Sequence, residues 1–145
     1  MKKVFLSLLL IPFAGIGRFD NSSLHSKKPV EIRSGDWPII LERSIDHADT
    51  SYSIQFRDMQ VMSATVLDTL AFPNTEQLRY FEKALTTLKA GSTGDIARFK
   101  NYSITKTDKK KDGAWYLLRL KWTSTDFKQA DADLMVQTIR GLKFD

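Results

Sequence analysis

Residues 98–122 decide the fold, and they read RFKNYSITKTDKKKDGAWYLLRLKW. Two runs that alternate between apolar and polar residues flank a polar centre with a glycine, which is the pattern of a β-hairpin. If Thr107 pairs with Trp115, the two faces separate cleanly, whereas a shift by one residue would mix them. The expected core face carries Tyr102, Ile104, Lys106, Tyr116, Leu118, Leu120 and Trp122. The expected outward face carries Asn101, Ser103, Thr105, Trp115, Leu117, Arg119 and Lys121.

Three earlier runs extend the strand pattern. WPIILERSI (37–45) and SYSIQFR (51–57) alternate in the same way around the polar DHADT, so they predict another hairpin. Residues 61–72 place apolar side chains at even positions, with Asp68 interrupting that face, and predict a third strand.

FPNTEQLRYFEKALTTLKAG (72–91) predicts a helix. Asn74 is a suitable N-terminal cap, and Gly91 is expected to end the helix in a left-handed conformation. The inward stripe at helical spacing is Leu78, Phe81, Ala84, Leu85 and Leu88.

TDFKQADADLMVQTIRGLKF (125–144) predicts a closing helix. Thr125 or Asp126 would cap it. The side chains expected to point inward are Leu134, Met135, Ile139 and Leu142.

The expected order is β-β-β-α-β-β-α, an α+β fold with one antiparallel sheet of about five strands and two helices packed on one face. The two halves share a loosely similar strands-then-helix layout without a residue-level repeat. In this layout alone, the chain resembles the Pur and Whirly single-stranded nucleic-acid-binding folds. No stretch matches a motif of either family, so no functional residue is carried over.

The amino terminus predicts export. MKKVFLSLLLIPFAGIG (1–17) has two lysines, a short charge-free apolar run and small residues, as a bacterial secretory signal does. We expect cleavage near Gly17 and a periplasmic or secreted protein with no transmembrane segment in the mature chain. Residues 18–36 are expected to be a flexible lead-in, with a short extended piece at 30–33, to a single domain at 37–145. The alternative is an apolar first helix or strand of a cytosolic fold.

Composition narrows the function classes. The chain has 145 residues, of which 42% are hydrophobic and 27% charged, as in an ordinary globular domain. It has no cysteine, which excludes disulfides, thiol nucleophiles and cysteine-ligated metals. Without residues 1–17, 20 basic and 17 acidic side chains remain, a net charge of +3. That excess is small for a dedicated nucleic-acid binder.

The sequence offers no clear catalytic or metal site. His47 lies in DHAD, which is more typical of a polar turn than of a metal site. Asp131 and Asp133 are two residues apart on the expected helix, so they point to different faces and suit its positive N-terminus instead. No hydrolase, metalloprotease or P-loop motif is present. These observations predict no cofactor and favour a non-enzymatic binding or envelope-associated module.

The outward face of the hairpin at 98–122 is the candidate contact surface. Its mixture of aromatic, cationic and hydroxyl side chains suits an anionic partner, such as an acidic glycan or a lipid headgroup, or another envelope protein. The alternative is single-stranded nucleic acid, whose bases stack on aromatic side chains in basic grooves. The candidate residues are Trp115, Leu117, Arg119 and Lys121 on this face, with Lys106, Lys109, Lys110 and Lys111 near its rim.

Overall fold

The computed structural model describes residues 27–33, 38–46, 49–59, 67–109, 111 and 113–142. These residues form an α+β protein with two four-stranded antiparallel sheets and two helices. The first sheet contains β1 (Lys27–Arg33), β2 (Ile39–Asp46), β3 (Asp49–Arg57) and β4 (Leu67–Phe72). The second contains β5 (Ile96–Arg98), β6 (Tyr102–Lys109), β7 (Gly113–Leu120) and β8 (Ser124–Lys128). Helix α1 (Thr75–Ala90) follows the first sheet and α2 (Gln129–Gly141) the second.

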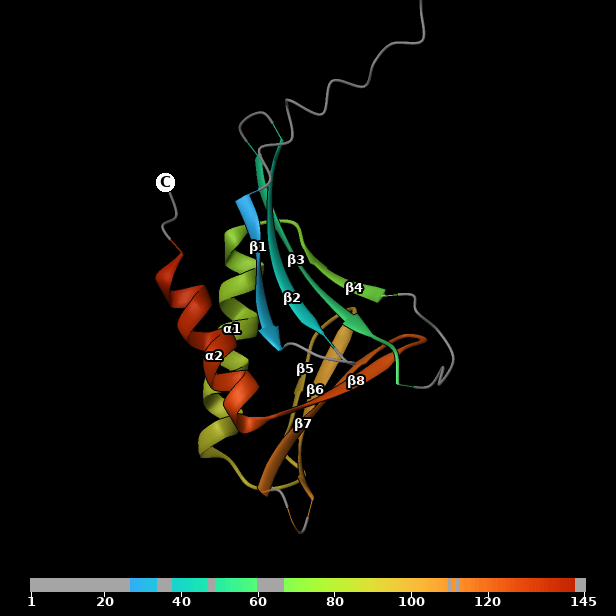
Figure 1. Cartoon of the computed structure of the whole chain (residues 1–145). Coiled ribbons are helices and arrows are strands. Elements are labelled where there is room, and N and C mark those ends of the chain that lie inside the picture. The colour runs from blue at the N-terminus through green and yellow to red at the C-terminus, as the bar shows by residue number, and fades with distance from the viewer. Residues whose placement is uncertain are drawn as a thin grey trace, which may run out of the picture.

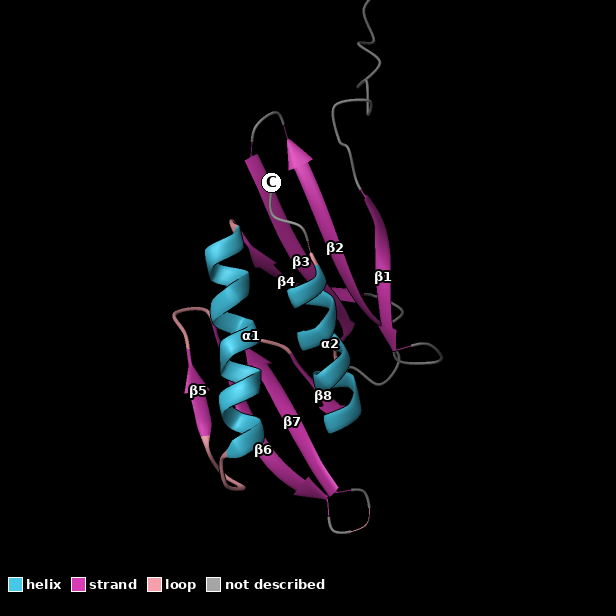
Figure 2. Ribbon diagram, turned by 90° about the vertical axis from the view of Figure 1, so that its left-hand side faces the viewer, coloured by secondary structure: helices cyan, strands magenta, loops and turns pink. Residues whose placement is uncertain are grey.

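Each half of the chain is therefore a four-stranded meander followed by a helix. The helices lie side by side and run antiparallel (Figures 1 and 2). Each helix packs against strands of both sheets: α1 contacts β3 and β4 but also β5 and β6, and α2 contacts β7 and β8 but also β1. The helices are thus the main link between the two halves.

One hydrophobic core joins all of these elements. The alternate residues of the strands point toward the helices, as the period of two requires, and the apolar stripe of α1 faces them. The side chains that are almost fully buried include Phe56, Phe72, Phe81, Tyr116 and Phe127.

The two sheets also touch directly where β3 ends and β8 begins. The backbone amide of Met59 donates to the carbonyl of Ser124 at 2.8 Å. The Asp58 carboxylate accepts the Ser124 amide at 3.1 Å. Nearby, the hydroxyl of Thr123 donates to the Asp68 carboxylate. Asp68, which interrupts the apolar face of β4, therefore connects the two sheets.

Several predictions are confirmed. Thr107 pairs with Trp115, and the whole predicted register of the hairpin at 98–122 follows. The strands at 37–45 and 51–57 pair antiparallel as β2 and β3. The Asn74 carboxamide caps α1 by accepting the Gln77 amide at 2.9 Å, and the predicted apolar stripe of α1 is buried.

The single five-stranded sheet is a correction: the α+β class holds, but the described strands form two four-stranded sheets. β1 lies within the segment expected to be a flexible lead-in, and it contains the short extended piece predicted at 30–33. β5 has three residues, too few for a periodicity. β8 occupies 124–128, which was assigned to the closing helix, so α2 starts at Gln129, with Lys128 rather than Thr125 or Asp126 at its cap position.

Three side-chain or backbone expectations were wrong. Trp122, expected in the core, is 77% exposed, because the chain turns between Leu120 and Thr123 before β8 begins. Leu134 is exposed because it lies about 100° around the helix from Met135, and the inward stripe of α2 is Ala132, Met135 and Ile139. Gly91 ends α1 with φ −81°, not in a left-handed conformation. A Cβ at Gly91 would instead meet the Asp95 carboxylate at 2.3 Å.

The predicted leader at 1–17, His47 and Lys110 lie outside the described residues. Within the described part of the chain, neither helix has the length and hydrophobicity needed to cross a membrane.

Candidate anion-binding groove

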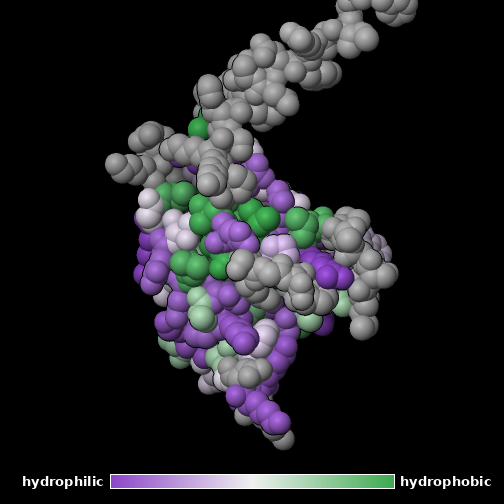
Figure 3. All heavy atoms as spheres, viewed as in Figure 1, coloured by the Kyte–Doolittle hydropathy of each residue, from purple (hydrophilic) through white to green (hydrophobic). Residues whose placement is uncertain are grey.

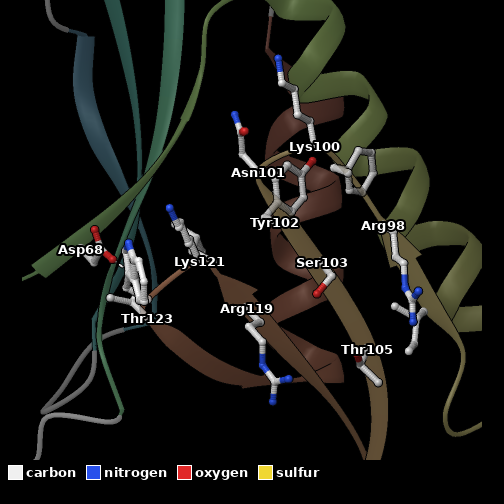
Figure 4. A pocket seen from close by; sticks show the side chains of 14 residues that line it. Asp68, Arg98, Lys100, Asn101, Tyr102, Ser103, Thr105, Arg119, Lys121 and Thr123 are labelled. Atoms are coloured by element: carbon white, nitrogen blue, oxygen red, sulfur yellow. Dashed lines mark hydrogen bonds between the residues drawn. The ribbon is translucent and has the colours of Figure 1, made fainter.

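A groove of about 830 Å³ opens on the outer face of the second sheet. Its floor is formed by β5, β6 and β7, and its rim by the loop at 99–101 and the turn at 121–123. Figure 4 shows that the cationic side chains come from β5, β7, the loop and the turn, while β6 contributes hydroxyl groups. The cations are Arg98, Lys100, Arg119 and Lys121.

Strand register assembles the floor of the groove. Ser103 pairs with Arg98 on one side and with Arg119 on the other, so the three residues form one cross-strand row. Neighbouring strands lie about 4.8 Å apart, which places the two arginine backbones about 10 Å from each other across Ser103. Thr105 lies two residues further along β6, on the same face, and adds a second hydroxyl.

Two tight turns bring the rest of the site to the same end of the sheet. The Phe99 amide donates to the Tyr102 carbonyl at 2.9 Å, which closes the turn that carries Lys100. The Leu120 amide donates to the Thr123 carbonyl at 2.9 Å, which closes the turn that carries Lys121 and Trp122. Both turns therefore project a cation at the rim.

The groove has an excess of positive charge. Among the described residues, Arg98, Lys100 and Arg119 form no ion pair with any acidic side chain. Asp68 is the one acidic residue among the described residues that line the groove. Its carboxylate is already engaged by the hydroxyl of Thr123 and by the amide of Thr69. The cations are thus available to a ligand with anionic oxygens.

Aromatic side chains border the groove. Trp122 is 77% exposed, and the ammonium of Lys121 lies 4.9 Å from its ring centroid. Phe99 stacks on Tyr102 with ring centroids 4.4 Å apart. The Tyr102 hydroxyl is buried and has no hydrogen-bond partner among the described residues. Burial raises the pKa of Tyr102 above its ordinary value, so the phenol stays neutral.

The predicted contact surface divides between two places. Arg119 and Lys121 line the groove. Lys106 lies on the opposite face, where its ammonium donates to the carbonyls of Lys89 and Gly91 at 2.9 and 2.7 Å and so caps the C-terminus of α1. Leu117 is half-buried in the middle of the sheet.

Among the other predicted residues, Lys109, Lys111 and Trp115 lie at or near the tip of the β6–β7 hairpin, a hydrophilic projection at the bottom of Figure 3. There Trp115 is only 9% exposed. The ammonium groups of Lys109 and Lys128 lie 3.8 and 5.3 Å from the centroid of its ring. Lys109 also forms an ion pair with Asp126. Lys109 and Lys128 therefore cover an aromatic residue of their own chain, while Lys111 is exposed.

Sequence reasoning missed Arg98, Lys100 and Trp122 as site residues. Arg98 belongs to β5, which was too short to recognise, and Trp122 was extrapolated into β7 from the alternation. The signal in the sequence was the presence of two short segments rich in basic and aromatic residues, at 98–100 and at 119–122.

The acidic residues of α2 have structural roles. The Asp131 carboxylate accepts the Lys128 amide at 3.0 Å and so caps the helix. Asp133 forms an ion pair of 2.8 Å with Lys89 of α1, and this hydrogen bond lowers the pKa of Asp133. No group of three or more His, Asp or Glu side chains that could hold a metal ion occurs in the described part of the chain.

Comparison with known proteins adds no relative to these observations. No known protein-family model matches the chain, and no curated protein matches it.

Proposed function

We propose that this chain is an exported, non-enzymatic binding module that holds an anionic ligand in the groove on its second sheet. The observation that carries the proposal is the set of four cations around one groove whose single acidic residue is already hydrogen-bonded. Charge-assisted hydrogen bonds from such groups to phosphate, sulfate or carboxylate oxygens are among the strongest that proteins make.

Export to the periplasm or beyond rests on residues 1–17, where two lysines precede a charge-free apolar run. Mass spectrometry of the protein from its native host tests this part, because a mature chain that retains Met1 would contradict it.

Titration with tripolyphosphate tests the groove. Arg119→Ser removes a cation from the groove floor, and we expect about a tenfold loss of affinity, as for a lost charged hydrogen bond. The matched control is Lys111→Ser, which removes an exposed cation at the hairpin tip and should change affinity by less than about twofold. Equal losses in both variants, or no binding by the original chain, would refute the groove as the site.

A second candidate is single-stranded nucleic acid, and the observation that favours it is the exposed Trp122, which lines the same groove as the four cations. A twelve-residue oligothymidine, titrated at two salt concentrations, separates the two candidates. Tight binding that weakens steeply with salt and is lost in Trp122→Ala would favour the nucleic acid. Weak binding that does not depend on Trp122 would favour the smaller anion.

A further inference from the structure

We propose that the ligand is an anionic amphiphile, a lipid-like molecule whose headgroup occupies the basic groove and whose single alkyl chain occupies a neighbouring apolar cleft. The headgroup half of this inference rests on the proposed function. The alkyl half rests on a second cavity, at the edge of the same sheet.

The apolar cleft lies between α1 and β5 and has a volume of about 550 Å³. Its walls include Ala84 and Leu88 from the helix, and Ala97 and Phe99 from β5 and the residue after it. The two alanines are the reason that space remains, because larger side chains at these positions would fill the gap between helix and strand. The small side chains at the contact between α1 and β5 therefore account for the cleft.

The cleft and the basic groove adjoin. Ile96 and Phe99 line both of them. They lie in or next to β5, which has three residues and forms the edge of its sheet, beside α1 (Figure 2). Since β5 is the outermost strand of its sheet in the described part of the chain, a ligand can pass from the groove over this edge into the cleft. Ile96 stands at the junction and is 45% exposed.

The polar groups around the cleft are mostly bound to their own chain. The Asp95 carboxylate accepts the Ser92 amide at 2.7 Å. The Thr87 hydroxyl donates to the Lys83 carbonyl at 2.9 Å. Each of these groups thus already makes a hydrogen bond within its own chain, and the surface that the cleft offers is mainly apolar. Lys83, at the rim, adds one further cation.

The two cavities together specify the chemistry of the ligand. The groove offers cations that lack acidic partners, while the cleft offers apolar surface that is favourable to remove from water. A nucleic acid or a sugar would leave the cleft unfilled, and a neutral apolar molecule would leave the cations unused. An anionic headgroup with an alkyl tail satisfies both.

Titration with a series of alkyl phosphates tests this inference. Butyl, hexyl, octyl and decyl phosphate are added below their micelle concentrations, and backbone amide shifts are followed by NMR. We expect affinity to rise about twofold per methylene, roughly half the free energy of full burial because one side of the cleft is open. The added shifts should fall on Ala84, Leu88 and Ala97.

Two variants localise the effect of chain length. Ile96→Gln makes the junction polar, and Thr87→Trp fills the cleft from an exposed helix position. Each should reduce the rise to less than about 1.3-fold per methylene, while butyl phosphate still binds. The matched control is Leu134→Gln, which replaces another exposed apolar residue (42%, against 45% for Ile96) on α2 and should keep the full chain-length dependence.

The outcomes separate this inference from the proposed function. If tripolyphosphate binds in an Arg119-dependent manner but alkyl length has no effect, the amphiphile is refuted and the anion-binding groove stands. If neither tripolyphosphate nor any alkyl phosphate binds, both are refuted. An equal loss of chain-length dependence in Leu134→Gln would also overturn the assignment of the tail to this cleft.

Discussion

Trp115 lies in β7 and Trp122 lies seven residues later, just after the end of that strand, and each has a lysine near its ring. Trp115 is 9% exposed and Trp122 is 77% exposed. Trp115 lies in β7 with a paired neighbour on each side, Thr107 and Lys128, so side chains from both strands cover it. Trp122 lies in the turn after β7, where it pairs with no strand in the described part of the chain.

The difference shows that the same residue types can form a closed cluster or an open one. At the hairpin tip, the lysines cover Trp115 and pair with Asp126. At the turn, Lys121 and the nearby Arg119 belong to a groove with few acidic groups. A basic and aromatic sequence thus indicates a binding surface only where its side chains are left without partners by the fold.

The largest expected effect concerns the stability of the two tryptophan variants. Trp115→Ala should lower the free energy of unfolding by about 3 kcal/mol, at the low end for a buried tryptophan because part of its cover is flexible lysine. Trp122→Ala should lower it by less than about 0.5 kcal/mol, as an exposed position does. Urea unfolding measures both. Similar losses in the two variants would remove the distinction.

The next effect concerns Tyr102, which is buried like Trp115 but borders the groove. Tyr102→Phe removes a buried hydroxyl that has no partner in the described structure, and should raise the free energy of unfolding by about 1 kcal/mol. Tyr116→Phe is the matched control: it removes a hydroxyl that donates to Gln129, and should lower the same quantity by about 1 kcal/mol.

The burial of Tyr102 also leads us to expect that the free energy of unfolding depends on pH. Burial raises its pKa in the folded chain, so its phenol stays protonated while that of the unfolded chain ionises near its ordinary pKa of 10.0. The unfolded state then binds fewer protons, and stability falls as the pH rises above about 10. Urea unfolding across this range should show a smaller fall in Tyr102→Phe. An unchanged slope would contradict the assignment to Tyr102.

The smallest effect concerns the lysines beside the tryptophans. Lys109→Ala removes the cation above Trp115 and the ion pair with Asp126, and should cost about 0.5–1 kcal/mol. In a chain that retains only Trp115, acrylamide quenching of its fluorescence should increase. Lys121→Ala, in a chain that retains only Trp122, should change neither stability nor quenching. Equal changes in both would mean that neither lysine covers its ring.

The sequence predicted strand pairing and helix position correctly where a long periodic run of residues ended at a clear turn or capping residue. The register of β6 and β7, the β2–β3 pair and the cap and stripe of α1 follow from such runs. β5 and β8 were missed because three or five residues carry too little periodicity, and a strand that runs directly into a helix has no turn signal between them.

The candidate site was only partly predictable for a related reason. Arg119 and Lys121 were expected to point outward from β7, and they line the groove. Arg98 depends on β5, and Trp122 depends on where β7 ends, which alternation alone does not give. Lys106 illustrates a further limit, because its binding to the end of α1 depends on a helix that lies 15 or more residues earlier in the chain.

Each helix packs on strands of the other half of the chain, and this arrangement affects how the outer faces of the two sheets can change in sequence. Two units of the same element order, joined by antiparallel helices that exchange contacts, have the form of an isologous dimer contained in one chain. In a true homodimer, a change on one sheet would appear on both. Here β2 and β3 present a Glu42–Gln55 hydrogen bond on their outer face, while β6 and β7 present Ser103 and Arg119. Because the two units are parts of one chain, the outer face of one sheet can acquire a binding site while the outer face of the other keeps different residues.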